Sequence, residues 1–346
     1  MTVVVALLGL ILLIVIHELG HMLTAKALGV RVPEFGVGFG PALFKKKFGK
    51  TVYSFRIILL GGFAKMAGMN DDDEGPDTYP AKPAWRRALI IFAGPFANLV
   101  AAVVILAGTL MVSGVLVGTP VVDKVERGSM ADDVGVRSGD RLVAVDGKRI
   151  EKWDGFTQAV RDKKPGDEVS LTVERNGSER EFSGTLGESK QVPNQALVGV
   201  RPEVRQETLG PIEATGMALK TTGDISVKML VFMGQLVTGE QDFYKNVTGP
   251  VGIASVGSTA VSQGFFPQLL ALISLNLAIF NLLPILPLDG GHLFFIAAEK
   301  IIGRPVRPET MGKVAALGIT LVLVLFLFAT YADLSKLFTG QPFIPD

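Results

Sequence analysis

Long apolar stretches alternate with charged segments along this 346-residue chain. Four stretches carry no charge or almost none, and they cover residues 3–25, 88–122, 264–288 and 314–332. A helix of about 20 apolar residues crosses the hydrocarbon core of a bilayer. The pattern therefore predicts four transmembrane helices, and the second stretch is long enough to tilt or to extend beyond the bilayer.

The first apolar stretch has a signal peptide as its alternative interpretation. No Lys or Arg precedes Lys26, and no small-residue cleavage site follows the apolar core. The stretch also carries His17, Glu18 and His21, which a discarded peptide would not need. We therefore expect this segment to stay in the membrane as a helix.

Basic residues predict the orientation of these helices. Lys and Arg are numerous in 26–87, between the first two apolar stretches, and recur in 300–313, between the last two. Cytoplasmic loops carry an excess of Lys and Arg. We therefore expect a multi-pass membrane protein in which both loops are cytoplasmic, with both termini and residues 119–263 outside.

Residues 118–202 have a different character, because charges return among short alternating runs. The runs 121–125, 141–145 and 169–173 are typical of strands, and 153–161 is typical of a helix. Hairpin turns are predicted at Asp146-Gly147 and at Asn176-Gly177. This part is expected to form a small mixed α/β domain.

The segment 203–263 is interpreted as a linker. Residues 225–237 are apolar except for Lys228, which is too short a run to span a bilayer comfortably. An interfacial helix is expected there, and residues 248–253 are expected to form a turn. The predicted domains are therefore 1–117 (helices 1 and 2), 118–202 (α/β domain), 203–263 (linker) and 264–346 (helices 3 and 4).

Composition narrows the function classes. Hydrophobic residues make up 48% of the chain and charged residues 19%, whereas soluble domains are about one quarter charged. The net charge of +1 gives no case for nucleic acid as a partner. The absence of cysteine from the sequence excludes disulfides, thiolate metal ligands and a cysteine nucleophile. The remaining candidates for metal ligands and catalytic groups are the three histidines and the carboxylates.

Two of those histidines form an HExxH motif, His17-Glu18-Leu19-Gly20-His21, within the first predicted helix. The spacing of four residues places both imidazoles on one helix face, where they can share a metal ion. Glu18 can accept a proton from a water at that metal. Neutral imidazoles favour zinc, and ionisable groups inside a membrane helix are functional by default.

A third protein ligand is expected from the run that ends the third apolar stretch, Asn281-Leu-Leu-Pro-Ile-Leu-Pro-Leu-Asp289-Gly-Gly-His292. Its prolines break the helix and free backbone groups, which are tolerated at membrane depth only where they line a protein cavity. Asp289 and His292 are both candidate ligands on chemistry alone. Asp289 has the further alternative of capping the start of the following loop.

These motifs together resemble the site-2 protease family of intramembrane zinc metalloproteases. The likeness rests on HExxH in the first predicted helix and on N-x-x-P-x-x-P-L-D-G in the third. Gly94-Pro-Phe-Ala-Asn98 is similar to the family's G-P-x-x-N signature, and 135–147 resembles a PDZ domain. The chain shows one PDZ-like unit, where some relatives carry two.

The resemblance implies a zinc site made by His17, His21 and Asp289, with Glu18 as the base. It also implies that 33–66 is a membrane-associated β-hairpin, whose strand edge would hold an unwound substrate. The expected substrate contacts are Asn98, Asn281, Gly61 and Gly62. Two alternatives stay open, namely that Asn98 only packs helices and that the hairpin is an ordinary cytoplasmic one.

The expected fold is a polytopic α-helical membrane protein with four transmembrane helices, a membrane-associated β-hairpin and an inserted extracytoplasmic PDZ-like α/β domain. The expected function is a zinc metalloendopeptidase that cuts transmembrane segments of pre-trimmed single-pass proteins, such as an anti-sigma factor or signal-peptide remnants. Its partners would be that substrate and the lipid bilayer, and the PDZ-like domain would contact substrate or exclude untrimmed substrate.

Two rival functions belong to other classes. A PDZ adaptor with a vestigial metal site would have no use for the intact Glu18. A metal transporter would use intramembrane His and Asp as an ion path. The lack of further carboxylates in the apolar stretches disfavours the transporter.

Overall fold

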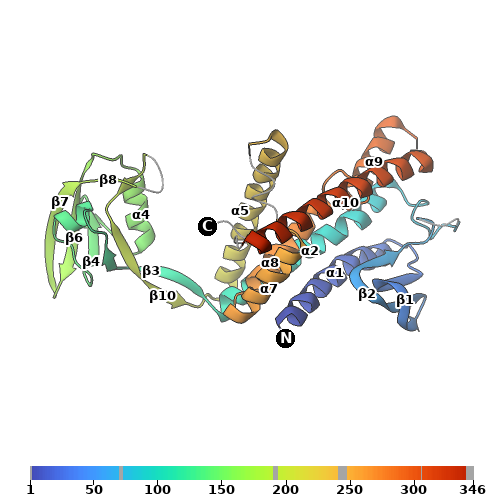
Figure 1. Ribbon diagram of the computed structural model, residues 1–346, viewed down its shortest axis with the longest axis horizontal. Coiled ribbons are helices and arrows are strands. Elements are labelled where there is room, and N and C mark those ends of the chain that lie inside the picture. Colours follow the sequence, from blue (N-terminus) through green and yellow to red (C-terminus); the bar gives the residue numbers. More distant parts are fainter. Residues whose placement is uncertain (1, 70–72, 190–193, 241–247, 305, 340–346) are drawn as a thin grey trace. The chain divides into compact units, whose positions relative to one another are not determined.

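The computed structural model of the protein (Figure 1) describes residues 2–69, 73–189, 194–240, 248–304 and 306–339. Contacts divide the chain into two compact units. The first unit contains Met1–Thr109 and Pro211–Asp346, and the second is Leu110–Gly210. The second unit is therefore an insertion into the first along the sequence.

Three helices in the described part of the chain are long and apolar enough to cross a membrane. They are α1 (Thr2–Ala27), α2 (Ala84–Val112) and α10 (Pro308–Thr339). The predicted span 264–288 is helical only in part, as α8 (Phe266–Asn281), whose 16 residues extend about 24 Å. Its helix stops before Pro284, because proline has no N–H for the helical hydrogen-bond pattern.

The second predicted span, 88–122, is wrong at its C-terminal end, because helix α2 stops at Val112. Gly114 follows in the left-handed conformation, with φ of 70°, and a Cβ there would overlap the Glu207 backbone. The rest of the apolar run is strand β3 (Val115–Val125), which pairs with β10 (Val200–Glu207). Apolarity alone does not separate a spanning helix from a valine-rich strand.

Of two expectations for the linker 203–263, the helix is present but longer than predicted, and the turn is wrong. The helix expected at 225–237 is α5 (Pro211–Thr238), which has 28 residues. The apolar pattern marked only its C-terminal half, because a helix continues equally well through polar residues. The turn expected at 248–253 is instead the start of helix α7 (Pro250–Gln263). Asp333 of α10 accepts hydrogen bonds from the backbone N–H groups at the start of α7, so a distant residue caps this helix.

Strands β1 (Glu34–Phe48) and β2 (Thr51–Lys65) form an antiparallel pair over the range predicted for a hairpin. At the turn Phe48 pairs with Thr51. The start of β1 pairs with both ends of β2, since Glu34 lies opposite Val52 and also opposite Lys65. The end of β2 therefore lies along the start of β1, beside helix α1, which both strands contact.

The core of the first unit lies where helices α1 and α2, the β1–β2 pair and α9 (Asp289–Ile302) meet. Its buried members are Met22, Ala25, Val30, Val32, Phe35, Met66, Tyr79, Ile90, Ile91 and Ile296. Burying aliphatic side chains of this size contributes about 1.5–3 kcal/mol each. This core holds α9 and the C-terminal part of α1 in fixed relation.

The second unit is a six-stranded sheet in the order β10-β3-β4-β6-β7, with β5 on β4. The further strands of this sheet are β4 (Arg141–Val145), β5 (Lys148–Arg149), β6 (Glu168–Arg175) and β7 (Ser178–Thr185). Two short strands, β8 (Gly187–Glu188) and β9 (Ala196–Leu197), form a separate antiparallel pair. Helices α3 (Met130–Asp133) and α4 (Trp153–Arg161) complete the unit. Asp146 and Asn176 have positive φ, as the predicted hairpin turns require.

A buried ion pair ties the end of strand β6 to the loop before β4. Arg175 donates to both carboxylate oxygens of Asp140 at 2.6 Å each, and the Asp140 side chain is 1% exposed. Burial alone would raise the pKa of Asp140, but the hydrogen bonds from Arg175 and from the Arg137 backbone outweigh it. The pKa of Asp140 is therefore held below its usual value.

Candidate metal centre

The two histidines of the HExxH motif belong to one buried stripe of helix α1. Gly9, Leu13, His17 and His21 are all buried and follow at intervals of four residues. Residues four apart stack along one helix face. Both imidazoles therefore point away from the exposed side of α1 and toward the rest of the first unit.

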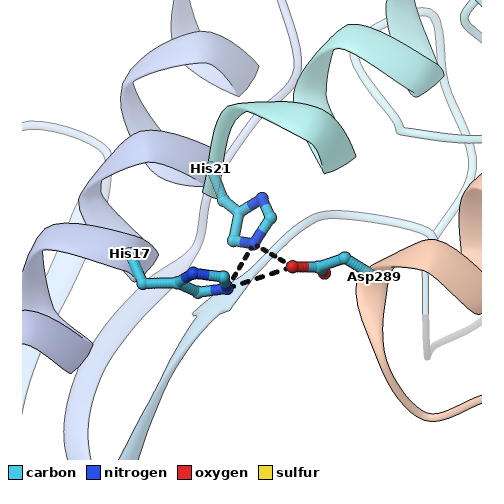
Figure 2. Close-up of side chains that lie close together, drawn as sticks. All are labelled: His17, His21 and Asp289. Atoms are coloured by element: carbon cyan, nitrogen blue, oxygen red, sulfur yellow. Dashed lines mark hydrogen bonds and ion pairs between the residues drawn. The ribbon is translucent and has the colours of Figure 1, made fainter. Parts of the chain in front are cut away.

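Asp289 meets both imidazoles from the first turn of helix α9 (Figure 2). Its Oδ2 atom lies 3.0 Å from His17 Nε2 and 3.3 Å from His21 Nε2. The two Nε2 atoms are 3.2 Å apart. Among the described residues, these three side chains form a group with metal-ligand spacing.

The dimensions of this group fit zinc. Bonds of about 2.0–2.2 Å in tetrahedral coordination place neighbouring ligand atoms roughly 3.3–3.5 Å apart. The three observed separations, 3.0, 3.2 and 3.3 Å, are close to that range. Asp289 Oδ2 is buried without a hydrogen-bond partner, as expected of an atom that faces a cation. Two His and one carboxylate leave the fourth position open, as catalytic zinc sites do.

The tautomer of His21 follows from its backbone partner. His21 Nδ1 lies 2.8 Å from the carbonyl oxygen of Ile90 in helix α2. Because a carbonyl only accepts, Nδ1 carries the proton and Nε2 keeps its lone pair. That lone pair is directed at the space shared with His17 and Asp289, so His21 is arranged as a metal ligand.

Two glycines allow helices α1 and α2 to approach at the site. A Cβ at Gly94 would overlap the imidazole of His21, and a Cβ at Gly20 would overlap the backbone of Ala93. Small residues let membrane helices pack closely. The sequence showed Gly94 only as part of a motif, and its contact with His21 was missed because the contact partner lies on another helix.

Glu18 is adjacent to His17 in the chain but is not a member of the metal-ligand group formed by His17, His21 and Asp289. At Gly62, a Cβ would come within 3.0 Å of Glu18 Cγ. Strand β2 therefore passes directly beside the predicted base, with Gly62 against its side chain.

The structure places the other predicted substrate contacts as follows. Asn98 of α2 is fully buried, with its amide against His17. Asn281 is the last residue of α8, and its amide donates to the Leu277 carbonyl at 2.9 Å. Gly61 lies in β2 with φ of 119°, one residue before Gly62.

His292, the rival ligand, is not a member of the metal-ligand group that the described residues form. It lines a neighbouring cavity of about 120 Å³ with Tyr79, Arg87 and Glu299. Arg87 donates two hydrogen bonds to Glu299, of 2.9 and 2.6 Å, which join the first turn of α2 to the end of α9. Sequence reasoning missed this pair, because its members are 212 positions apart.

The model of peptidase family M50 matches residues 5–325. The chain belongs to peptidase family M50. This is the site-2 protease family, so the resemblance drawn from the motifs is confirmed, and the M50 chain is a zinc metalloprotease.

Curated relatives of this M50 chain extend over nearly its whole length. It is 30% identical to the zinc metalloprotease RasP of Shouchella clausii, over 94% of this chain and 97% of that protein. It is also 30% identical to RasP of Geobacillus kaustophilus, over 94% and 96%. A similar solved structure, the PDZ domain of an SdrC-like protein from Listeria monocytogenes, covers 25% of this chain and 90% of that chain with 21% identity and a TM-score of 0.23.

Proposed function

We propose that this M50 protease cuts transmembrane segments of single-pass membrane proteins whose outer part has already been removed. The observation that carries the proposal is the position of the HExxH motif within helix α1. His17 and His21 lie on its buried face, and α1 is long and apolar enough to cross a membrane. A peptide bond hydrolysed at this site would therefore lie within or beside the bilayer.

The proposed roles follow from the contacts at the site. His17, His21 and Asp289 hold the zinc, which when bound supplies a Lewis acid that activates a water molecule toward the peptide carbonyl. Glu18 accepts the proton of that water and then donates it to the leaving amine. Strand β2 lies against the Glu18 side chain at Gly62 and so limits where its carboxylate can move.

Strand β2 supports a mode of substrate binding. A helical substrate must unwind before a protease can reach its carbonyl, and an exposed strand edge stabilises the extended form. Residues 62–65 pair with β1 along one edge. Gly62 lies against the Glu18 side chain, so this part of β2 is beside the proposed catalytic residues. Gly61 and Gly62 would let substrate backbone approach there, and Asn281 would contact it from the end of α8.

The surface of the β1–β2 pair supports its association with the membrane. Its outer part exposes large apolar side chains, among them Phe44 at 60% and Phe48 at 77%. The basic residues there are Lys45, Lys46, Lys47 and Lys50, and 35–69 contains no acidic residue. Aromatic groups with lysines suit the boundary between acyl chains and anionic headgroups.

The proposed topology has four crossings of the inner membrane. The third consists of α8 with the irregular residues that follow it, since non-helical backbone is tolerated at membrane depth where protein covers it. The basic loops lie in the cytoplasm, with the active site toward that side, and both termini and the second unit lie outside.

The second unit is proposed to act as a PDZ-like domain. Such domains bind an extended peptide at a sheet edge, and its sheet has β7 and β10 at the ends of its strand order. It would contact the substrate or exclude untrimmed proteins from the site. By family resemblance, the substrate is an anti-sigma factor or a signal-peptide remnant.

The test is Glu18→Gln, with Glu213→Gln on the exposed side of α5 as the matched control. The amide of Gln keeps the size of the side chain and cannot take the proton. We expect unchanged zinc content and a loss of cleavage of a model transmembrane substrate of about 10²–10⁴-fold. Turnover within tenfold of the control would contradict the role of Glu18. Cleavage of a soluble unfolded peptide without cleavage of the transmembrane substrate would contradict the intramembrane function.

A further inference from the structure

The amide of Asn98 is buried against a predicted zinc ligand. Asn98 is 0% exposed, and its Nδ2 lies 3.3 Å from Nδ1 of His17. Its Oδ1 is also buried and has no hydrogen-bond partner. The amide is therefore enclosed within the first unit, where its nearest polar neighbour is an imidazole nitrogen.

The proton on His17 decides which atom of the amide faces the ring. If Nδ2 donates to Nδ1, the proton of a neutral His17 must be on Nε2, which then has no lone pair for a metal. If Nδ1 carries the proton, it needs an acceptor, and the Nε2 lone pair is free. Rotating the amide by half a turn supplies that acceptor as Oδ1, with almost no change in shape.

The metal decides between these two orientations. In each orientation one atom of the Asn98 amide bonds to His17 and the other atom has no partner. The number of hydrogen bonds that the amide makes therefore does not favour one orientation. His17 Nε2, however, lies 3.0 Å from Asp289 Oδ2 and 3.2 Å from His21 Nε2, in the group whose spacing fits zinc. A bound cation requires the lone pair on Nε2, and hence Oδ1 of Asn98 against Nδ1.

We propose that Asn98 is a positioning residue that accepts a hydrogen bond from His17 Nδ1–H and so fixes His17 as a zinc ligand. The inference rests on the zinc site of the proposed function. It gives His17 the same support that His21 has, since His21 Nδ1 donates to the Ile90 carbonyl. Both acceptors belong to α2, so one helix orients both imidazoles of α1.

The position of Asn98 is itself well supported. Its backbone carbonyl accepts a hydrogen bond of 2.8 Å from Ser274 Oγ in α8. Gly94, one turn earlier in α2, is the residue on which the His21 ring lies. A ligand held by a side chain that is itself fixed between helices keeps its geometry better than one held from a loop.

The test measures zinc affinity by competition with a chelator, using the purified full-length protein in detergent without substrate. Asn98→Leu removes the acceptor at similar volume, and we expect it to weaken zinc binding about 10–100-fold. Asn98→Asp keeps an acceptor oxygen and removes the donor, so its affinity should stay within fivefold of wild type or rise. Thr109→Ala removes a hydroxyl elsewhere in α2, where it donates to the Ile105 carbonyl, and should also stay within fivefold.

Thermal unfolding of each metal-free variant checks the fold. The proposal is overturned if Asn98→Leu binds zinc within fivefold of wild type, or if Asn98→Asp loses more than fivefold. If Asn98→Leu does not fold, the zinc affinity of Asn98→Asp alone decides the test. A loss of more than fivefold in that variant would then overturn the proposal. Because no substrate is present, failure of the intramembrane function would leave these results unchanged.

Discussion

The contact between Gly94 and His21 predicts a severe effect for a single added methyl group. In Gly94→Ala the new Cβ would overlap Nε2, Cε1 and Cδ2 of the imidazole. The ring cannot simply retreat, because its Nδ1 donates at 2.8 Å to the Ile90 carbonyl, one turn earlier on the same helix. The ring must therefore lose that hydrogen bond, or α1 and α2 must separate.

The size of the effect follows from these two costs. Overpacking of a filled site costs about 1–3 kcal/mol, and the lost hydrogen bond contributes about 1 kcal/mol. Zinc affinity should therefore fall by about 2–4 kcal/mol, which is roughly 30-fold to 1,000-fold. Cleavage at limiting zinc should fall with it.

Gly108→Ala is the matched control in the same helix. A Cβ at Gly108 meets no atom within 4 Å, and alanine is the better helix former. Zinc affinity of both variants is measured by chelator competition, together with turnover of a transmembrane substrate at limiting zinc. The reasoning is refuted if Gly94→Ala binds zinc within threefold of Gly108→Ala.

Further predictions concern the ligands, the second unit and the topology. Asp289→Ala should remove zinc and activity, whereas His292→Ala should keep zinc, as metal analysis will show; zinc lost only from His292→Ala would make this a three-histidine site. Asp140→Ala leaves Arg175 without its buried partner and should destabilise the second unit by about 3 kcal/mol, measured by hydrogen exchange in the full chain. The lowered pKa of Asp140 means that its contribution is complete above the usual carboxyl pKa of about 3.9 and is lost as pH falls through the folded-state value, so this part of the acid sensitivity should be absent from Asp140→Ala. A reporter fused after Gly177 should be active only outside the cytoplasm, and cytoplasmic activity would refute the orientation.

Local sequence patterns determined the features that depend on near neighbours in the chain. The spacing of His17 and His21 places both rings on one face of any helix, whatever surrounds it. Asp146-Gly147 and Asn176-Gly177 adopt positive φ because those residues tolerate it at little cost. Helix α4 (Trp153–Arg161) likewise has the bounds that its pattern predicts.

Features that depend on distant contacts required the tertiary structure. The apolar run after Val112 is a strand because β10, some eighty residues later, pairs with it. Helix α7 begins at Pro250 because Asp333 caps it. In both cases the decisive partner is remote in sequence, so periodicity gave no signal.

The candidate site divides in the same way. The sequence by itself determined that two imidazoles and a carboxylate base belong to one apolar helix. It left Asp289 and His292 both as candidates on chemistry alone, and the family resemblance favoured Asp289, but three residues in a proline-broken run can point in different directions. Only the packing of α9 against α1 and α2 brought Asp289 within 3.3 Å of both histidines and set His292 in the cavity with Arg87. The physical reason is that ligand type is a property of a side chain, whereas ligand geometry depends on how separate helices pack together.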